Sequence, residues 1–359
     1  MTMLEEINIL VERGHYEEAL GKIQELADPI ERVTALADIA VAIYQHGDPA
    51  EWIPGILEDA IYIAKKLKDP SDKVIAYSII ASSLAMIDYE EDAMDFFNRA
   101  IDETDSIKSP IEKGIVLSIL AYRLALAGYS DNAFEMFNVA FDTIIGAEIG
   151  YTHKVDGIIR IGELLEKVGD TLPSNKALDF YRMAFDIFEK LHVSQKAAIV
   201  EKKIELAKTV YNVGLPEIRT ALLEGRNHYA LAFLEKKYSG VMRLIGELEV
   251  ALWLKRVNDP EYLEIIDKAF EHCENPRFTD ANVQHIARLL IELGNLRRAL
   301  KFAKEIQNIH KRSEALKAIA LELVRRKKFE EVKKVIEIIP DPKIREEVLN
   351  EIGTIQESQ

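Results

Sequence analysis

Cysteine is almost absent from this chain of 359 residues, and Cys273 is the single example. One cysteine excludes an internal disulfide framework and any metal site built from several thiolates. His272 stands beside it, but adjacent side chains on a helix point in different directions. The sequence therefore predicts an inert thiol at this position, and neither a metal site nor a cofactor.

Long apolar runs are also missing. No run approaches the roughly 18 residues that a membrane span requires. The first residues, Met1 to Glu6, already include two acidic side chains. They lack the basic segment followed by an apolar segment that is typical of a secretory leader. These features predict a cytoplasmic protein that does not contact a membrane.

Positive charge is scarce in the first third of the chain. Residues 1–110 hold 9 Lys and Arg against 23 Asp and Glu, and the net charge of the whole chain is −15. Residues 279–359 differ, with 16 Lys and Arg against 13 Asp and Glu. The acidic balance argues against general binding to the backbone of nucleic acids.

Catalytic motifs are missing as well. The sequence has no GxxxxGK[ST] loop, no strand followed by GxGxxG, and no HExxH. Its histidines are scattered and lie mostly near predicted turns. We therefore expect a protein that is not an enzyme, although a pocket with convergent polar groups of perturbed pKa would support a catalytic alternative.

Helical periodicity is what the sequence does contain, nearly from end to end. Residues 110–146 show the unit: an apolar-patterned run to Ala127, a turn at Gly128–Asp131, and a second run to Gly146. The short turn predicts two antiparallel helices. Such a pair cannot bury its outer face alone, so it needs neighbours of the same kind.

The neighbours recur at a fixed period. Positions equivalent to Arg32 return at offsets of 40 or 41 residues as Lys73, Lys113 and Lys154, and from Gly294 onward the period contracts to 33. This pattern predicts an all-α fold, an α-solenoid of antiparallel helix pairs. Glycine and proline break the pattern over residues 214–240. We expect an N-terminal array at 1–213, a boundary or irregular seam at 214–240, and a C-terminal array at 241–359 whose last helix is a cap.

Small and aromatic residues at set spacings resemble the tetratricopeptide repeat. A small residue precedes a Leu by three positions, a Gly follows in several copies, and then comes Ala-x3-Phe/Tyr-x2-Ala. The residues are Ala81, Leu84, Ala93, Phe97 and Ala100; Ala121, Leu124, Gly128, Ala133, Phe137 and Ala140; Gly162, Leu165, Gly169, Ala177, Tyr181 and Ala184; and, more loosely, Ala287, Leu290, Gly294, Ala299 and Ala303. The family's Trp and Leu-Gly opening is missing and the period is longer, so another helical solenoid with the same packing is the alternative.

The resemblance implies a right-handed superhelix that binds a peptide or protein in a concave groove lined by the first helices. Carried over by position, the groove residues are Thr34, Ala37, Val41, Tyr44, Ile75, Ser78, Ser82, Ile115, Ser118, Tyr122, Ile159 and Glu163. The Lys, Arg and Asn clamp that binds acidic chaperone tails is not at these positions. We therefore expect an interaction scaffold that holds an apolar peptide or helix of a partner. The alternative is that these residues only pack on neighbouring helices.

Basic residues near the C-terminal end give a second hypothesis, an adaptor that binds an acidic partner or, less in keeping with the charge, nucleic acid. The candidate residues are Arg297, Arg298, Arg325, Arg326, Lys327, Lys328, Lys333 and Lys334. Cations at the end of a helix also complement its dipole, which is the structural explanation. The acidic half of a second copy is a further possible partner, which would give self-association.

Overall fold

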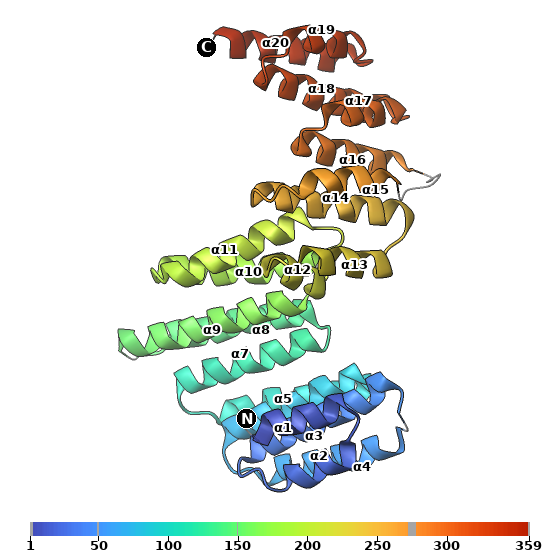
Figure 1. The fold of residues 1–359 in the computed structure, drawn as a ribbon. Coiled ribbons are helices and arrows are strands. Elements are labelled where there is room, and N and C mark those ends of the chain that lie inside the picture. The colour runs from blue at the N-terminus through green and yellow to red at the C-terminus, as the bar shows by residue number, and fades with distance from the viewer. Residues whose placement is uncertain (1–2, 49, 149, 272–277, 358–359) are drawn as a thin grey trace. The chain divides into compact units, whose positions relative to one another are not determined.

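The computed structural model describes residues 3–48, 50–148, 150–271 and 278–357, so His272 and Cys273 lie outside the described residues. Within them the chain forms twenty α-helices, two short 3-10 helices and no strand (Figure 1). Most helices pack against the next one along the chain as pairs. The predicted all-α fold of helix pairs is confirmed. No helix in this part of the chain combines the length and apolarity needed to cross a bilayer.

Two compact units make up the chain. One comprises the residues up to Leu172 together with Lys176–Lys202, and the other comprises Pro173–Asn175 and the residues from Lys203 onward. The chain passes from the first to the second within one helix, α11 (Ser194–Thr209). The stretch 214–240, where the sequence pattern breaks, contains two short helices of the C-terminal unit.

The N-terminal unit begins with two short helices and continues with longer ones. Its further elements are α1 (Met3–Glu12), α2 (Tyr16–Ile23), α3 (Pro29–His46), η1 (Ala50–Trp52), α4 (Ile53–Lys66), α5 (Pro70–Met86), α6 (Glu90–Glu103), η2 (Thr104–Ser106), α7 (Pro110–Leu126), α8 (Ser130–Ile145), α9 (Tyr151–Thr171) and α10 (Ser174–Lys190). Helices α3, α5, α7 and α9 pack side by side as the first helices of successive pairs.

The C-terminal unit repeats this arrangement with shorter second helices. Its helices are α12 (Pro216–Leu223), α13 (Asn227–Lys237), α14 (Gly240–Arg256), α15 (Tyr262–Glu271), α16 (Asp280–Leu293), α17 (Leu296–Glu305), α18 (Ile309–Arg325), α19 (Phe329–Glu337) and α20 (Pro342–Glu357). Helices α14, α16, α18 and α20 form the row of first helices. The buried side chains of the unit form one cluster from Leu206 to Val348.

Recurrent capping residues start and stop the first helices. Asp28 and Asp69 accept hydrogen bonds from backbone N–H groups of the first turns of α3 and α5, and a proline follows each of them. The residue after the last turn is left-handed in several pairs. Gly294 (φ 88°) ends α16 in this way, and Lys327 (φ 58°) takes the same conformation after α18. Most of the first helices, α9 excepted, therefore end in a sharp turn that starts the partner helix.

Small residues let paired helices approach closely, as the spacing predicts. The aromatic residues of the repeat, Phe97, Phe137 and Tyr181, are at most 2% exposed. Gly169 on α9 faces Tyr181 on α10: a Cβ atom added to Gly169 would lie 2.4 Å from Cε1 of the ring. Because real Cβ atoms do not come that near, the pair α9–α10 requires glycine here.

Gly169→Ala is expected to lower the free energy of unfolding by roughly 1–3 kcal/mol, since the added methyl must displace a buried ring. Gly21→Ala is the matched control, because Gly21 also lies within a helix but has no atom within 4 Å of an added Cβ. The control is expected to gain up to about 1 kcal/mol from helix propensity. Chemical denaturation checks both, and changes of the same sign would contradict the packing argument.

Candidate functional site

Four of the predicted groove residues are buried. Ala37, Ser78, Ser82 and Ser118 are at most 1% exposed. The serine hydroxyls donate to carbonyls of their own helices: Ser78 to Ile75, Ser82 to Ile79 and Ser118 to Ile115, at 2.6–2.9 Å. These four side chains fill the space between neighbouring first helices, so they present no surface to a partner.

The other predicted groove residues lie nearer the surface. Thr34, Val41, Ile75, Ile115, Tyr122, Ile159 and Glu163 are half-buried and Tyr44 is exposed. Tyr44 donates to the carboxylate of Asp88, and this hydrogen bond raises the pKa of the phenol. Glu163 forms an ion pair with Lys196. A peptide-binding role for this row of helices stays a prediction.

Two charged residues that the sequence did not single out lie on the same row. Burial raises the pKa of Asp38 on α3, and the charge of Arg123 on α7 opposes that rise. Burial likewise lowers the pKa of Arg123. The Nε atom of Arg123 is buried and has no hydrogen-bond partner among the described residues. Asp38 nevertheless lies at the surface and Arg123 is half-buried, so this part of the row is charged but open to solvent.

The predicted basic residues separate into groups in the structure. Arg297, Arg326, Lys328 and Lys334 line one large cavity. Arg298 instead bonds Asp267 at 2.9 Å and lies over the ring of Phe270. The rest take other places: Lys333 pairs with Glu330, Lys327 occupies the turn after α18, and Arg325 lines a smaller neighbouring cavity.

The large cavity, called here the basic cavity, has a volume of about 1260 Å³ and lies wholly in the C-terminal unit. Half of its lining is apolar or aromatic: Tyr262, Leu263, Ile266, Leu293, Leu296, Leu300, Ile319, Leu323, Val335 and Ile338. Six residues are cationic and two are acidic: Lys255, Arg297, Lys304, Arg326, Lys328 and Lys334 against Asp267 and Glu331. A chain with a net charge of −15 has gathered positive charge around an apolar surface.

Exposed apolar side chains and unpaired cations both occur in this cavity. Leu263 is 58% exposed and Ile338 is 40% exposed. Among the described residues, no carboxylate pairs with Arg297, Lys304 or Lys334. Lining of this kind can hold a ligand that is apolar on one side and negatively charged on the other.

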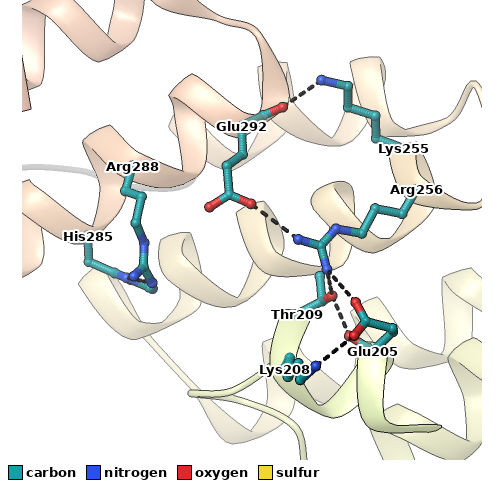
Figure 2. A network of polar contacts seen from close by, with 8 residues as sticks. All are labelled: Glu205, Lys208, Thr209, Lys255, Arg256, His285, Arg288 and Glu292. Atoms are coloured by element: carbon teal, nitrogen blue, oxygen red, sulfur yellow. Dashed lines mark hydrogen bonds and ion pairs between the residues drawn. The ribbon is translucent and has the colours of Figure 1, made fainter. Parts of the chain in front are cut away.

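A network of polar contacts fixes the helices beside the basic cavity (Figure 2). Arg256, at the end of α14, donates to Thr209 on α11 at 2.6 Å and to the Glu292 carboxylate on α16 at 3.3 Å. Its neighbour Lys255 donates to the backbone carbonyl of Glu292 at 2.6 Å. The last turn of α14 is thereby tied to the C-terminal end of α16.

The same network includes a buried carboxylate. Glu249 on α14 is 1% exposed and accepts hydrogen bonds from the side-chain amide of Asn212 at 2.5 Å and from its backbone N–H at 3.1 Å. Arg288 lies 3.0 Å from Nδ1 of His285, and arginine only donates. Nε2 of the same ring lies 3.3 Å from Oε1 of Glu249 and 3.1 Å from the side-chain amide nitrogen of Asn212. These contacts join α14 to α16 and to the end of α11. The network therefore holds these helices in position.

Sequence reasoning missed Lys255 and Lys304 as well as the apolar lining. A Lys-Arg pair at a helix end is ordinary, and nothing in its local pattern indicates that Lys255 meets the turn after α18. In the part of the chain that the structure describes, no three His, Cys, Asp or Glu side chains come together as a metal site.

Comparison with known proteins gives one strong likeness. Ton1535 from Thermococcus onnurineus NA1, whose crystal structure is known, is 79% identical, with 99% of this chain and 100% of that chain covered and a TM-score of 0.95. A circular tandem repeat protein (13% identity, 99% of this chain and 90% of that chain) and the apo quorum sensor NprR from B. thuringiensis (12%, 94% and 96%) have TM-scores of 0.26, so these two likenesses carry no argument. No protein-family model and no curated protein matches the chain, so the tetratricopeptide repeat remains a resemblance.

Arg256→Met is expected to lower the free energy of unfolding by about 1–2 kcal/mol, because it removes charge-assisted hydrogen bonds that join three helices. Arg325→Met is the matched control, since the Arg325 side chain is 75% exposed and its ion pair with Glu322 spans 3.5 Å. We expect the control to cost under about 0.5 kcal/mol. Equal costs in a denaturant titration would contradict the positioning role.

Proposed function

The chain belongs to the same family as Ton1535 of Thermococcus onnurineus NA1, and we propose that it is a non-catalytic protein-binding repeat protein. Its partner presents an acidic, amphipathic segment that occupies the basic cavity. This proposal joins the scaffold and the acidic-partner hypotheses at one place in the C-terminal unit. The observation that carries it is the lining of the basic cavity, which combines ten apolar or aromatic residues with six cations and two carboxylates.

Size favours a polypeptide segment over a small molecule. Typical small-ligand pockets measure roughly 300–1,000 Å³, whereas the basic cavity measures about 1260 Å³ and takes its lining from six helices, α14 to α19, and from the turns after α16, α18 and α19. An amphipathic helix can place apolar residues against such a surface at every third or fourth position. Its remaining positions then face the cations of the rim.

The charge of the cavity lining favours a partner segment with negative charge. The lining carries an excess of four positive charges, and three of its cations have no carboxylate partner among the described residues. Acidic side chains of a bound segment would pair with them, while a basic segment would be repelled. The apolar lining supplies affinity that salt does not screen, which separates this site from a phosphate-backbone site, where affinity falls steeply with salt.

The test is fluorescence anisotropy with two labelled amphipathic peptides of roughly 18 residues that share leucines at helical spacing and differ in carrying Glu or Lys elsewhere. The Glu peptide is expected to bind and the Lys peptide not. Leu263→Glu should weaken binding of the Glu peptide at least tenfold, because it removes an apolar anchor and adds a repelling charge.

Leu349→Glu is the control for that change, since Leu349 is 53% exposed on α20 and does not line the basic cavity. Its affinity should equal that of the unaltered protein. Equal binding of both peptides, or equal losses in the two variants, would overturn the proposal. Tighter binding of a short single-stranded RNA with steep loss in salt would point to nucleic acid instead.

A further inference from the structure

Two cations of the basic cavity meet at the C-terminal end of α16, although they come from different helices. Lys255, in the last turn of α14, donates to the Glu292 carbonyl at 2.6 Å. Arg326, just after α18, donates to the Gly294 carbonyl at 3.3 Å. These two acceptors are two residues apart, so the ammonium and guanidinium groups are neighbours.

Gly294 is part of this arrangement. It has a left-handed φ of +88°, and a Cβ atom added to it would lie 2.9 Å from Nη2 of Arg326. The guanidinium therefore packs against the bare backbone of the turn. Arg326 is held from its other side by Glu322, which accepts from its Nε at 3.0 Å.

The closeness of the two cations affects the pKa of Lys255. Burial lowers the pKa of its ammonium, the charge of Arg326 lowers it further, and Glu322 and Glu292 raise it. The hydrogen bond of Lys255 goes to a neutral carbonyl, and the Glu292 carboxylate is directed to Arg256. Glu322 pairs with Arg326 and not with Lys255, so Lys255 has no ion-pair partner among the described residues.

Lys255 and Arg326 are also the two residues that the basic cavity shares with a smaller cavity of about 380 Å³. The smaller cavity has four cationic lining residues, Lys255, Arg256, Arg325 and Arg326, and two acidic ones. Both cavities that Lys255 and Arg326 line therefore have more cationic than acidic lining residues. Both groups keep unused N–H donors, since Lys255 uses one of three and Arg326 two of five.

We propose that Lys255 and Arg326 form an oxyanion subsite of the basic cavity, which binds a carboxylate or a phosphoryl group. An oxyanion between them would accept from an ammonium and a guanidinium at once, which is the strong, charge-assisted form of hydrogen bond. As the anchor of the partner segment the subsite rests on the proposed function, but anion binding by itself does not. The structural alternative is that the two cations only cap helix ends.

Lysine acetylation, measured residue by residue with mass spectrometry across pH, tests the subsite with inorganic phosphate as the probe. Lys255 should react at lower pH than Lys333, an exposed lysine outside the cavity, because a lowered pKa leaves more neutral amine. Phosphate should slow acetylation of Lys255 several-fold and leave Lys333 unchanged. Protection should fade as pH rises through the lowered pKa of Lys255, since its positive charge is lost there.

Arg326→Gln should raise the pKa of Lys255 toward its ordinary value and abolish the protection. Lys255→Gln should weaken binding of the Glu peptide about tenfold, and Lys255→Arg, which keeps the charge, should restore it. No protection by phosphate, equal slowing of both lysines, or protection that persists in Arg326→Gln would overturn the subsite. A lower Tm in Lys255→Gln with unchanged peptide binding would likewise mean that both cations only cap helix ends.

The two proposals fail separately in these experiments. If phosphate protects Lys255 but no acidic peptide binds, the subsite stands and the protein-binding function falls. If the Glu peptide binds Lys255→Gln and Arg326→Gln as tightly as the unaltered protein, the function stands and the subsite falls. A second peptide, with phosphoserine in place of one Glu, distinguishes the two oxyanions. The peptide that carries the oxyanion preferred by the subsite binds more tightly, and this gain in affinity depends on Lys255.

Discussion

Close approach of paired helices is the constraint on which this structure depends. A single pair leaves one face apolar and must be covered by the next, so the distance within each pair sets the spacing of the whole row. Alanine and glycine permit that distance, and one ring fills the space that remains, as at Gly169 and Tyr181. The period in the sequence arises because successive helix pairs repeat the same kinds of small and aromatic residues at the same packing positions.

The turns carry this regularity to the surface. Helices α14, α16 and α18 pack in succession, so their C-terminal ends come close together, and each is followed by a left-handed residue, Asn258, Gly294 or Lys327. Helix C-terminal ends carry partial negative charge, which favours Lys and Arg in the last turn. The row therefore gathers cations at one edge, and the number gathered exceeds the carboxylates beside them.

Much of the fold could be predicted, and little of the site. The helical periodicity, the short turns, the 40-residue period and the aromatic spacing predicted helices that the structure contains, since these signals lie within or between neighbouring stretches of the sequence. Ser78 and Ser118 were predicted at a surface but are buried, because a hydroxyl that bonds its own helix packs like a small apolar group. Lys255 and Arg326 meet only through the stacking of three helix pairs, and no local pattern in the sequence carries that information.

The contact between Gly294 and Arg326 has a consequence for how this family can change. A Cβ atom at 294 would lie 2.9 Å from Nη2 of Arg326, so the flexible arginine side chain would have to move off the turn. The left-handed φ of +88° favours glycine at 294 whatever residue stands at 326. Loss of the glycine would therefore strain the turn and move Arg326 away from Lys255, so relatives that keep the anion subsite should keep glycine at this position.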